Sequence, residues 1–153
     1  MKKYTFFIAA LFMASFAFGQ SYTEEMDLMQ AAFGMAKKDI VSAFVQPSAS
    51  QSDAFWMLYD EYETARKELG KERIALLEQF AKQYANMTAE QADAFTTSAL
   101  ALQKKTDKLI ATYYKKVKGI SDALVATQFY QVESYILTGI RMELLSEIPF
   151  VQK

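Results

Sequence analysis

Apolar side chains recur every three or four positions along most of the chain beyond residue 20. This spacing places them on one face of a helix, whereas the strict alternation typical of a strand is absent. The pattern predicts four helices, over residues 21–46, about 49–84, 88–118 and 121–149. Pro47 and Pro149 end the first and last of them, and Gly119 is expected to end the third in the left-handed conformation.

The second and third predicted helices are long. Helices of 30 or more residues span about 45 Å, which exceeds what a compact four-helix bundle of this mass needs. The sequence therefore predicts an all-α fold with four helices, two of them long, in an elongated antiparallel hairpin or cradle. Gly70, near the middle of the second helix, is consistent either with a bend or with an exposed position that tolerates a weak helix former.

Two short stretches indicate that the long helices begin in the same way. Residues 47–55 and 87–95 share Ala, Gln, Asp, Ala and Phe in register. Ser48 is followed three positions later by Gln51, and Thr88 by Gln91, which is the spacing of a capping box. We therefore expect each hydroxyl to accept a hydrogen bond from the backbone amide of its glutamine. Each glutamine side chain should in turn accept one from the backbone amide of Ser48 or Thr88.

The N-terminal residues resemble a secretory signal peptide. Lys2 and Lys3 precede an uncharged apolar run from Tyr4 to Phe18, and small residues come just before Gln20. The run is short for a membrane span, and a lipid anchor on cysteine is excluded because the chain has no Cys. We expect residues 1–19 to be a signal peptide and 20–153 a single all-helical domain, exported to the periplasm or secreted, with no stable membrane anchor.

The composition argues against several classes of function. Without Lys2 and Lys3 the chain has 15 basic and 18 acidic residues, so its charge does not favour a nucleic-acid partner. The absence of both His and Cys removes the usual general base, the thiolate nucleophile and the commonest metal ligands. The expectation is a protein that is not an enzyme, with no catalytic residues, no cofactor and no metal site.

Charged residues interrupt the apolar seams at three places. Arg66 and Arg73 fall on the stripe of the second helix, and Glu133 lies beside Val132 on the fourth. Because a buried charge needs a partner, we expect at least one arginine to pair with a carboxylate of Glu133 or Glu63. The alternative is that the arginine stems follow the seam while the guanidinium groups reach water.

Two groups of side chains are candidates for contact with a partner. Trp56 and Met57 lie off the main aromatic seam of the second helix, and Met26 and Met29 lie on the first helix, where flexible methionines suit varied surfaces. Core packing is the alternative for both groups. Lysines at residues 104–118 are expected on a solvated face, with weak steering of acidic partners as the alternative.

Met87-Thr88-Ala89-Glu90-Gln91 resembles the Leu-Thr-x-x-Gln signature of the Spy and CpxP family of periplasmic helical proteins. The stretch from Pro47 to Gln51 stands in the place of a first copy, with Ser for Thr and Pro for the leading Leu. The resemblance implies an antiparallel dimer of hooked helical hairpins that form a cradle. It also implies ATP-independent chaperone activity or a role in regulating envelope stress.

From these observations we expect an exported helical interaction protein that binds a polypeptide client or an envelope protein on an amphipathic surface. The alternative is a structural or regulatory envelope protein that docks one dedicated partner without chaperone activity. A homodimer is expected in either case, because long amphipathic helices in so short a chain are hard to cover within one copy.

Overall fold

The computed structural model describes residues 36–151, which contain helices, short turns and no strand. The chain divides into two compact units, residues 1–42 and 43–153. Described residues 36–44 are helical, and the chain leaves this helix before Pro47, as the proline predicts. The predicted signal peptide and the greater part of the first predicted helix lie outside the described residues.

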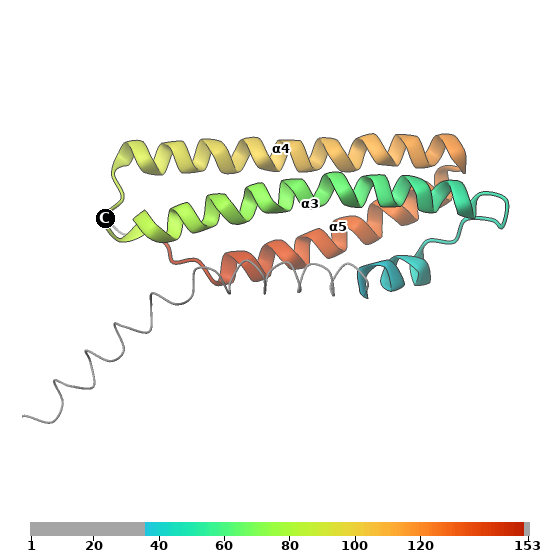
Figure 1. Cartoon of the computed structure of the whole chain (residues 1–153), viewed down its shortest axis with the longest axis horizontal. Helices are drawn as coiled ribbons and strands as arrows, with labels where there is room; N and C mark the ends of the chain where they lie inside the picture. The colour runs from blue at the N-terminus through green and yellow to red at the C-terminus, as the bar shows by residue number, and fades with distance from the viewer. Residues whose placement is uncertain (1–35, 152–153) are drawn as a thin grey trace, which may run out of the picture. The chain divides into compact units, whose positions relative to one another are not determined.

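The described part of the second unit consists mainly of the α-helices α3, α4 and α5 (Figure 1). Helix α3 spans Ser52–Gln83 and α4 spans Ala89–Ile120, each with 32 residues. The short 3₁₀ turn η2, Tyr84–Asn86, joins them, and α5 follows over Ala123–Ser146 with 24 residues. The all-α fold with two long helices is confirmed, and the element bounds agree with the predicted ones to within a few residues.

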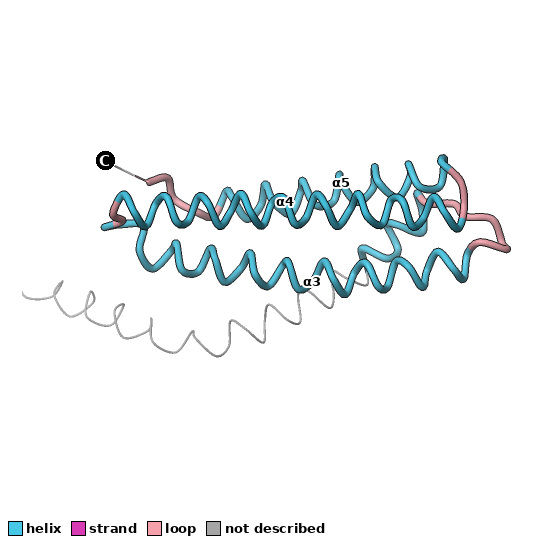
Figure 2. The backbone as a smooth tube through the Cα atoms, turned by 90° about the horizontal axis from the view of Figure 1, so that it is seen from above, coloured by secondary structure: helices cyan, strands magenta, loops and turns pink. Residues whose placement is uncertain are grey.

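The two long helices form an antiparallel hairpin in constant register. Glu61 pairs with Lys116 at 3.3 Å and Glu72 with Lys105 at 2.7 Å, so an advance of 11 residues along α3 matches a retreat of 11 along α4. Figures 1 and 2 both show these helices side by side over their whole length. Each forms because its apolar residues share one stripe, which the partner helix covers.

Helix α5 packs against α4, and no Cα atom of α5 lies within 8 Å of one in α3. Long side chains join α3 to α5 instead. Tyr62 of α3 is fully buried, and its ring meets Tyr113 of α4 edge-on at 5.4 Å and Phe129 of α5 edge-on at 5.2 Å. Tyr62 therefore stands where the three helices meet.

The core is concentrated at one end of this unit. Buried positions of α3 lie in its first half apart from Phe80, those of α4 begin at Leu102, and those of α5 end at Ile136. Because the helices are antiparallel, these segments meet around Tyr62. In the half of the hairpin next to η2, Phe80 and Leu102 are buried, and most of the other large apolar residues are half-buried.

The backbone conformation bears on the predictions made for two glycines. Gly119 was expected to end its helix in the left-handed conformation, and this is wrong, because no described glycine has a positive φ and α4 continues to Ile120. The chain turns at Ser121 instead, whose amide donates to the Val117 carbonyl at 3.0 Å. Gly70 lies inside α3 and is half-buried, and a Cβ added there would meet no atom within 4 Å.

Candidate functional site

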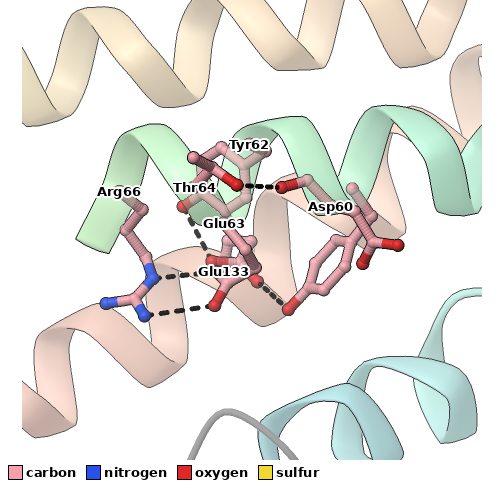
Figure 3. Close-up of polar contacts among 7 residues, drawn as sticks. Asp60, Tyr62, Glu63, Thr64, Arg66 and Glu133 are labelled. Carbon is pink, nitrogen blue, oxygen red and sulfur yellow. Dashed lines mark hydrogen bonds and ion pairs between the residues drawn. The ribbon is translucent and has the colours of Figure 1, made fainter. Parts of the chain in front are cut away.

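A buried carboxylate on α5 connects this helix to α3. Glu133 is fully buried, and two α3 phenols donate hydrogen bonds to it, Tyr59 to Oε1 at 3.2 Å and Tyr62 to Oε2 at 2.7 Å (Figure 3). Phenols at i and i+3 lie on the same face of a helix, which explains how both reach one carboxylate. Each carboxylate oxygen therefore has a hydroxyl donor.

This environment makes the tyrosines weaker acids. Burial raises the pKa of both phenols, and the negative charge of Glu133 and its hydrogen bond to each phenol raise it further. A phenol whose pKa is raised is a poor proton donor near neutral pH, so the cluster does not suit general acid catalysis. Its geometry suits a structural role, because it fixes the register between α3 and α5.

A second carboxylate forms an ion pair with Arg66, which the sequence places on the apolar stripe of α3. Arg66 donates from Nε to Glu63 Oε1 at 2.8 Å and from Nη2 to Oε2 at 3.1 Å, a two-pronged contact shown in Figure 3. Burial lowers the pKa of Arg66, but the hydrogen bonds and charge of Glu63 outweigh it, and the net pKa is raised. The expected pairing of at least one arginine with a carboxylate is therefore present, and Glu63 is the partner.

Arg73 behaves differently from Arg66. It is half-buried, and among the described residues no carboxylate lies within 4.0 Å of its guanidinium group. Burial lowers the pKa of Arg73, and the positive charge of Arg141 on α5 lowers it further. Arg73 therefore does not form the expected ion pair with any carboxylate of the described residues.

The two predicted capping boxes differ. At α4 the box is complete. The backbone amide of Gln91 donates to Thr88 Oγ1 at 3.2 Å, and the backbone amide of Thr88 donates to Gln91 Oε1 at 2.9 Å. At α3 only half of it forms. The Ser48 amide donates to Gln51 Oε1 at 3.1 Å, but the Ser48 hydroxyl contacts Ser50 instead of capping.

The reason for the incomplete box is the turn that precedes α3. The carbonyl of Ser48 accepts from the amides of Gln51 and Ser52, so these residues already form a helical turn and α3 begins only at Ser52. The backbone amide of Gln51 thus donates to the Ser48 carbonyl and not to the Ser48 hydroxyl, which contacts Ser50. The prediction that Ser48 caps the helix with its side chain is wrong.

The proposed partner-contacting residues are spread over different environments. Met57 is 69% exposed, whereas Trp56 is half-buried and meets the rings of Phe55 and Tyr59 edge-on at 5.0 and 5.5 Å. Met26 and Met29 lie outside the described residues.

A groove that the sequence did not point to lies beside η2, between the end of α3 and the start of α4. Its volume is about 300 Å³, and its lining includes Phe80 and Phe95, whose rings contact each other with centroids 4.5 Å apart. None of its lining residues is charged. They are Leu76, Gln79, Phe80, Gln83, Met87, Gln91, Ala94, Phe95 and Ser98.

The groove offers both apolar surface and amide groups. Phe, Leu and Met side chains provide adaptable apolar contacts, and the glutamines provide donors and acceptors that can meet a peptide backbone. Its volume is at the lower limit of small-molecule sites, which suits one apolar side chain with its flanking peptide groups. The glutamines at 79 and 83, four residues apart on one helix face, were the signal in the sequence that could have indicated it.

Around the groove, the half of the hairpin next to η2 carries an incompletely covered apolar surface. Its members are half-buried apolar residues on all three helices: Leu69, Leu76, Leu77, Ala92, Phe95, Ala99, Leu137, Ile140 and Leu144. A further group of apolar side chains is exposed on the outer face of α5: Leu124, Tyr135, Met142 and Leu145. Exposed apolar residues that share a face are typical of contact surfaces.

Within residues 36–151, no set of three or more acidic side chains is gathered closely enough to hold a metal ion. In the same range, no helix has the length and apolar character needed to span a bilayer. The chain was compared with protein-family models, curated proteins and solved structures, and no match was found in any of the three. The resemblance to the Spy and CpxP family therefore depends on the motifs given above.

Proposed function

We propose that this chain is an exported helical interaction protein that binds unfolded polypeptides without nucleotide, in the manner of an ATP-independent periplasmic chaperone. The observation that carries the proposal is the uncharged groove of about 300 Å³ beside η2, set in a half-buried apolar surface. Such a surface shields the exposed apolar residues of a client, and the glutamine amides accommodate its backbone.

The absence of charge in the groove supports broad binding of apolar segments. A charged lining would select clients of opposite sign, whereas an amide-rich lining accepts many sequences because amides both donate and accept. Methionine at the rim, Met87, adapts to side chains of different shape. Small-ligand carriage is less well supported, because it calls for a closed cavity between α3 and α5 and no α5 residue lines this groove.

The test is suppression of aggregation. A chemically denatured client is diluted into buffer with a near-stoichiometric amount of the protein and no ATP, and light scattering is followed. The proposal predicts reduced scattering with the parent protein. It predicts loss of that effect in Ala94→Arg, which places a long cation in the groove, but not in Ala81→Arg, an exposed α3 position outside it.

A helical circular dichroism spectrum in both variants ensures that they are compared as folded proteins. Scattering that the parent protein leaves unchanged would exclude the chaperone activity. Equal suppression by both variants would leave a chaperone whose binding site is not this groove.

The second candidate is docking of one dedicated envelope partner without chaperone activity. The exposed apolar residues on the outer face of α5, with Tyr135 at 81% and Met142 at 70% exposure, favour it. A pull-down from envelope extract would then return one stoichiometric species, which Tyr135→Ser together with Met142→Ser abolishes. Light scattering of the purified protein separates this outcome from homodimerisation, in which the partner is a second copy.

A further inference from the structure

The second half of α4 is strongly basic although the chain as a whole is slightly acidic. Residues 104–118 contain six lysines and one aspartate, against a net charge of −1 for the whole chain. All six lysines are exposed. Neither the groove nor the buried cluster contains any of them.

Four of these lysines form one straight ridge. At 100° per residue, the directions of Lys104, Lys108, Lys115 and Lys118 fall within about 80° of arc, and they span about 21 Å along the axis. The buried residues of the same stretch, such as Thr106, Tyr113 and Val117, point to the opposite side of α4. The lysine ridge, as we name these four residues, therefore faces away from the rest of the unit.

The ridge lysines also differ from their neighbours in their partners. Lys105 and Lys116 lie at the flank and pair with Glu72 and Glu61 of α3. Within the described part of the chain, no carboxylate lies within 4.0 Å of a ridge lysine. The single acid of the stretch, Asp107, accepts a hydrogen bond from Gln103 at 2.7 Å.

Ordinary helix physics accounts for only part of this arrangement. A cation near the C-terminus favours the helix dipole, but the effect is limited to the last turn, and Lys104 and Lys108 lie three or more turns before Ile120. Like charges at i,i+4, as in Lys104 and Lys108, repel and destabilise the helix. The ridge therefore costs stability unless an anionic partner meets it.

We propose that the lysine ridge is a docking surface for the phosphate groups of an anionic lipid membrane. A helix ridge is convex, so it cannot enclose an extended chain, but all four ammonium groups can meet a flat array of phosphates at once. Between the lysines the ridge has the small side chain of Ala111, and Leu100 precedes them at 58% exposure. Contact through this face leaves the groove beside η2 open to a polypeptide.

The test is co-sedimentation with lipid vesicles. The chain from Gln20 onward is used, so that the apolar run in residues 1–19 cannot contribute to vesicle binding, and the described helices contain none of these residues. Binding is expected to vesicles of phosphatidylglycerol and phosphatidylcholine at 50 mM salt, to weaken as salt rises, and to be absent with phosphatidylcholine alone.

The diagnostic variant replaces the four ridge lysines with glutamine. Each lysine near an anionic surface contributes about fivefold to partitioning, so K104Q/K108Q/K115Q/K118Q should reduce it by about 100-fold or more. The control K38Q/K67Q/K71Q/K82Q removes the same charge from other elements and should retain binding within about threefold. The single reversal Lys108→Glu should weaken binding by about 25-fold.

Three results would overturn the proposal. The first is parent-like vesicle binding by the ridge variant, and the second is equal loss of binding in ridge and control variants. The third is displacement of the protein from vesicles by a stoichiometric amount of polyglutamate, which would assign the ridge to an acidic polypeptide.

Discussion

Tyr62 and Glu133 lie 71 residues apart in sequence, and the Tyr62 hydroxyl donates a 2.7 Å hydrogen bond to Glu133 Oε2. Both side chains are fully buried. The bond joins α3 to α5, whose backbones are not in contact. The position of α5 against the hairpin thus depends in part on one phenol and one carboxylate.

Tyr62→Phe tests this dependence directly. The change removes a hydrogen bond to a charged group and keeps the ring in place, so unfolding free energy should fall by about 1.5–3 kcal/mol. Urea unfolding followed by circular dichroism measures it. Tyr135→Phe removes the hydroxyl of an α5 residue that is 81% exposed, and it should change the free energy by less than about 0.5 kcal/mol. Equal effects in the two variants would contradict a structural role for the Tyr62 bond.

Alkaline pH should destabilise the fold through the same cluster. Burial, and then the charge of Glu133, raises the pKa of Tyr59 and Tyr62 above the ordinary phenol value of about 10. Their contribution is therefore complete below pH 10 and is lost as pH rises above it, because the unfolded phenols release protons first. The slope should approach about 2.7 kcal/mol per pH unit for the two groups.

Urea unfolding at pH 9, 10 and 11 measures that slope. The double variant Tyr59→Phe/Tyr62→Phe should lose this part of the pH dependence, and Tyr135→Phe should retain it. An unchanged slope in the double variant would mean that other groups, such as the lysines, cause the alkaline loss.

The Glu63 and Arg66 pair should be coupled, because their side chains are only 11% and 12% exposed. Arg66→Met should lower the unfolding free energy by about 1–3 kcal/mol, less than for a fully buried pair because water screens part of the interaction. A double-mutant cycle with Glu63→Gln measures the coupling. The pair of Glu68 and Lys71 has the same spacing at 65% and 58% exposure, so its coupling should stay below about 0.5 kcal/mol.

The two caps should respond differently to alanine. Thr88→Ala removes an acceptor that meets the Gln91 amide and should cost about 1 kcal/mol. Ser48→Ala removes a hydroxyl that caps no amide and should cost less than about 0.5 kcal/mol. Thermal unfolding of both variants measures the difference, and equal losses would mean that both boxes operate in solution.

Gly70→Ala should stabilise the protein. A Cβ added at Gly70 meets no atom within 4 Å, and the residue is helical, so alanine gains helix propensity without a clash. The gain should be about 0.5–1 kcal/mol in urea unfolding. A loss instead would indicate that the glycine serves a conformation other than the one described.

The sequence alone determined much of the fold because its signals are local. Spacing of apolar residues set α3, α4 and α5 near their observed bounds, and Thr88 with Gln91 marked the start of α4 through groups only three residues apart. Pro47 likewise ended the preceding helix. Each of these signals acts through covalent geometry or neighbouring backbone atoms, which sequence spacing reports directly.

Only the tertiary structure decided which side chains far apart in sequence are in contact. It gave Glu133 two tyrosine donors, selected Glu63 for Arg66, and placed Phe80 beside Phe95 to form the groove. The structure also showed that the Ser48 hydroxyl does not cap α3, because the backbone amide of Gln51 donates to the Ser48 carbonyl instead. Helix faces are fixed by periodicity, but the choice between partners depends on the register of one helix against another, which only packing sets.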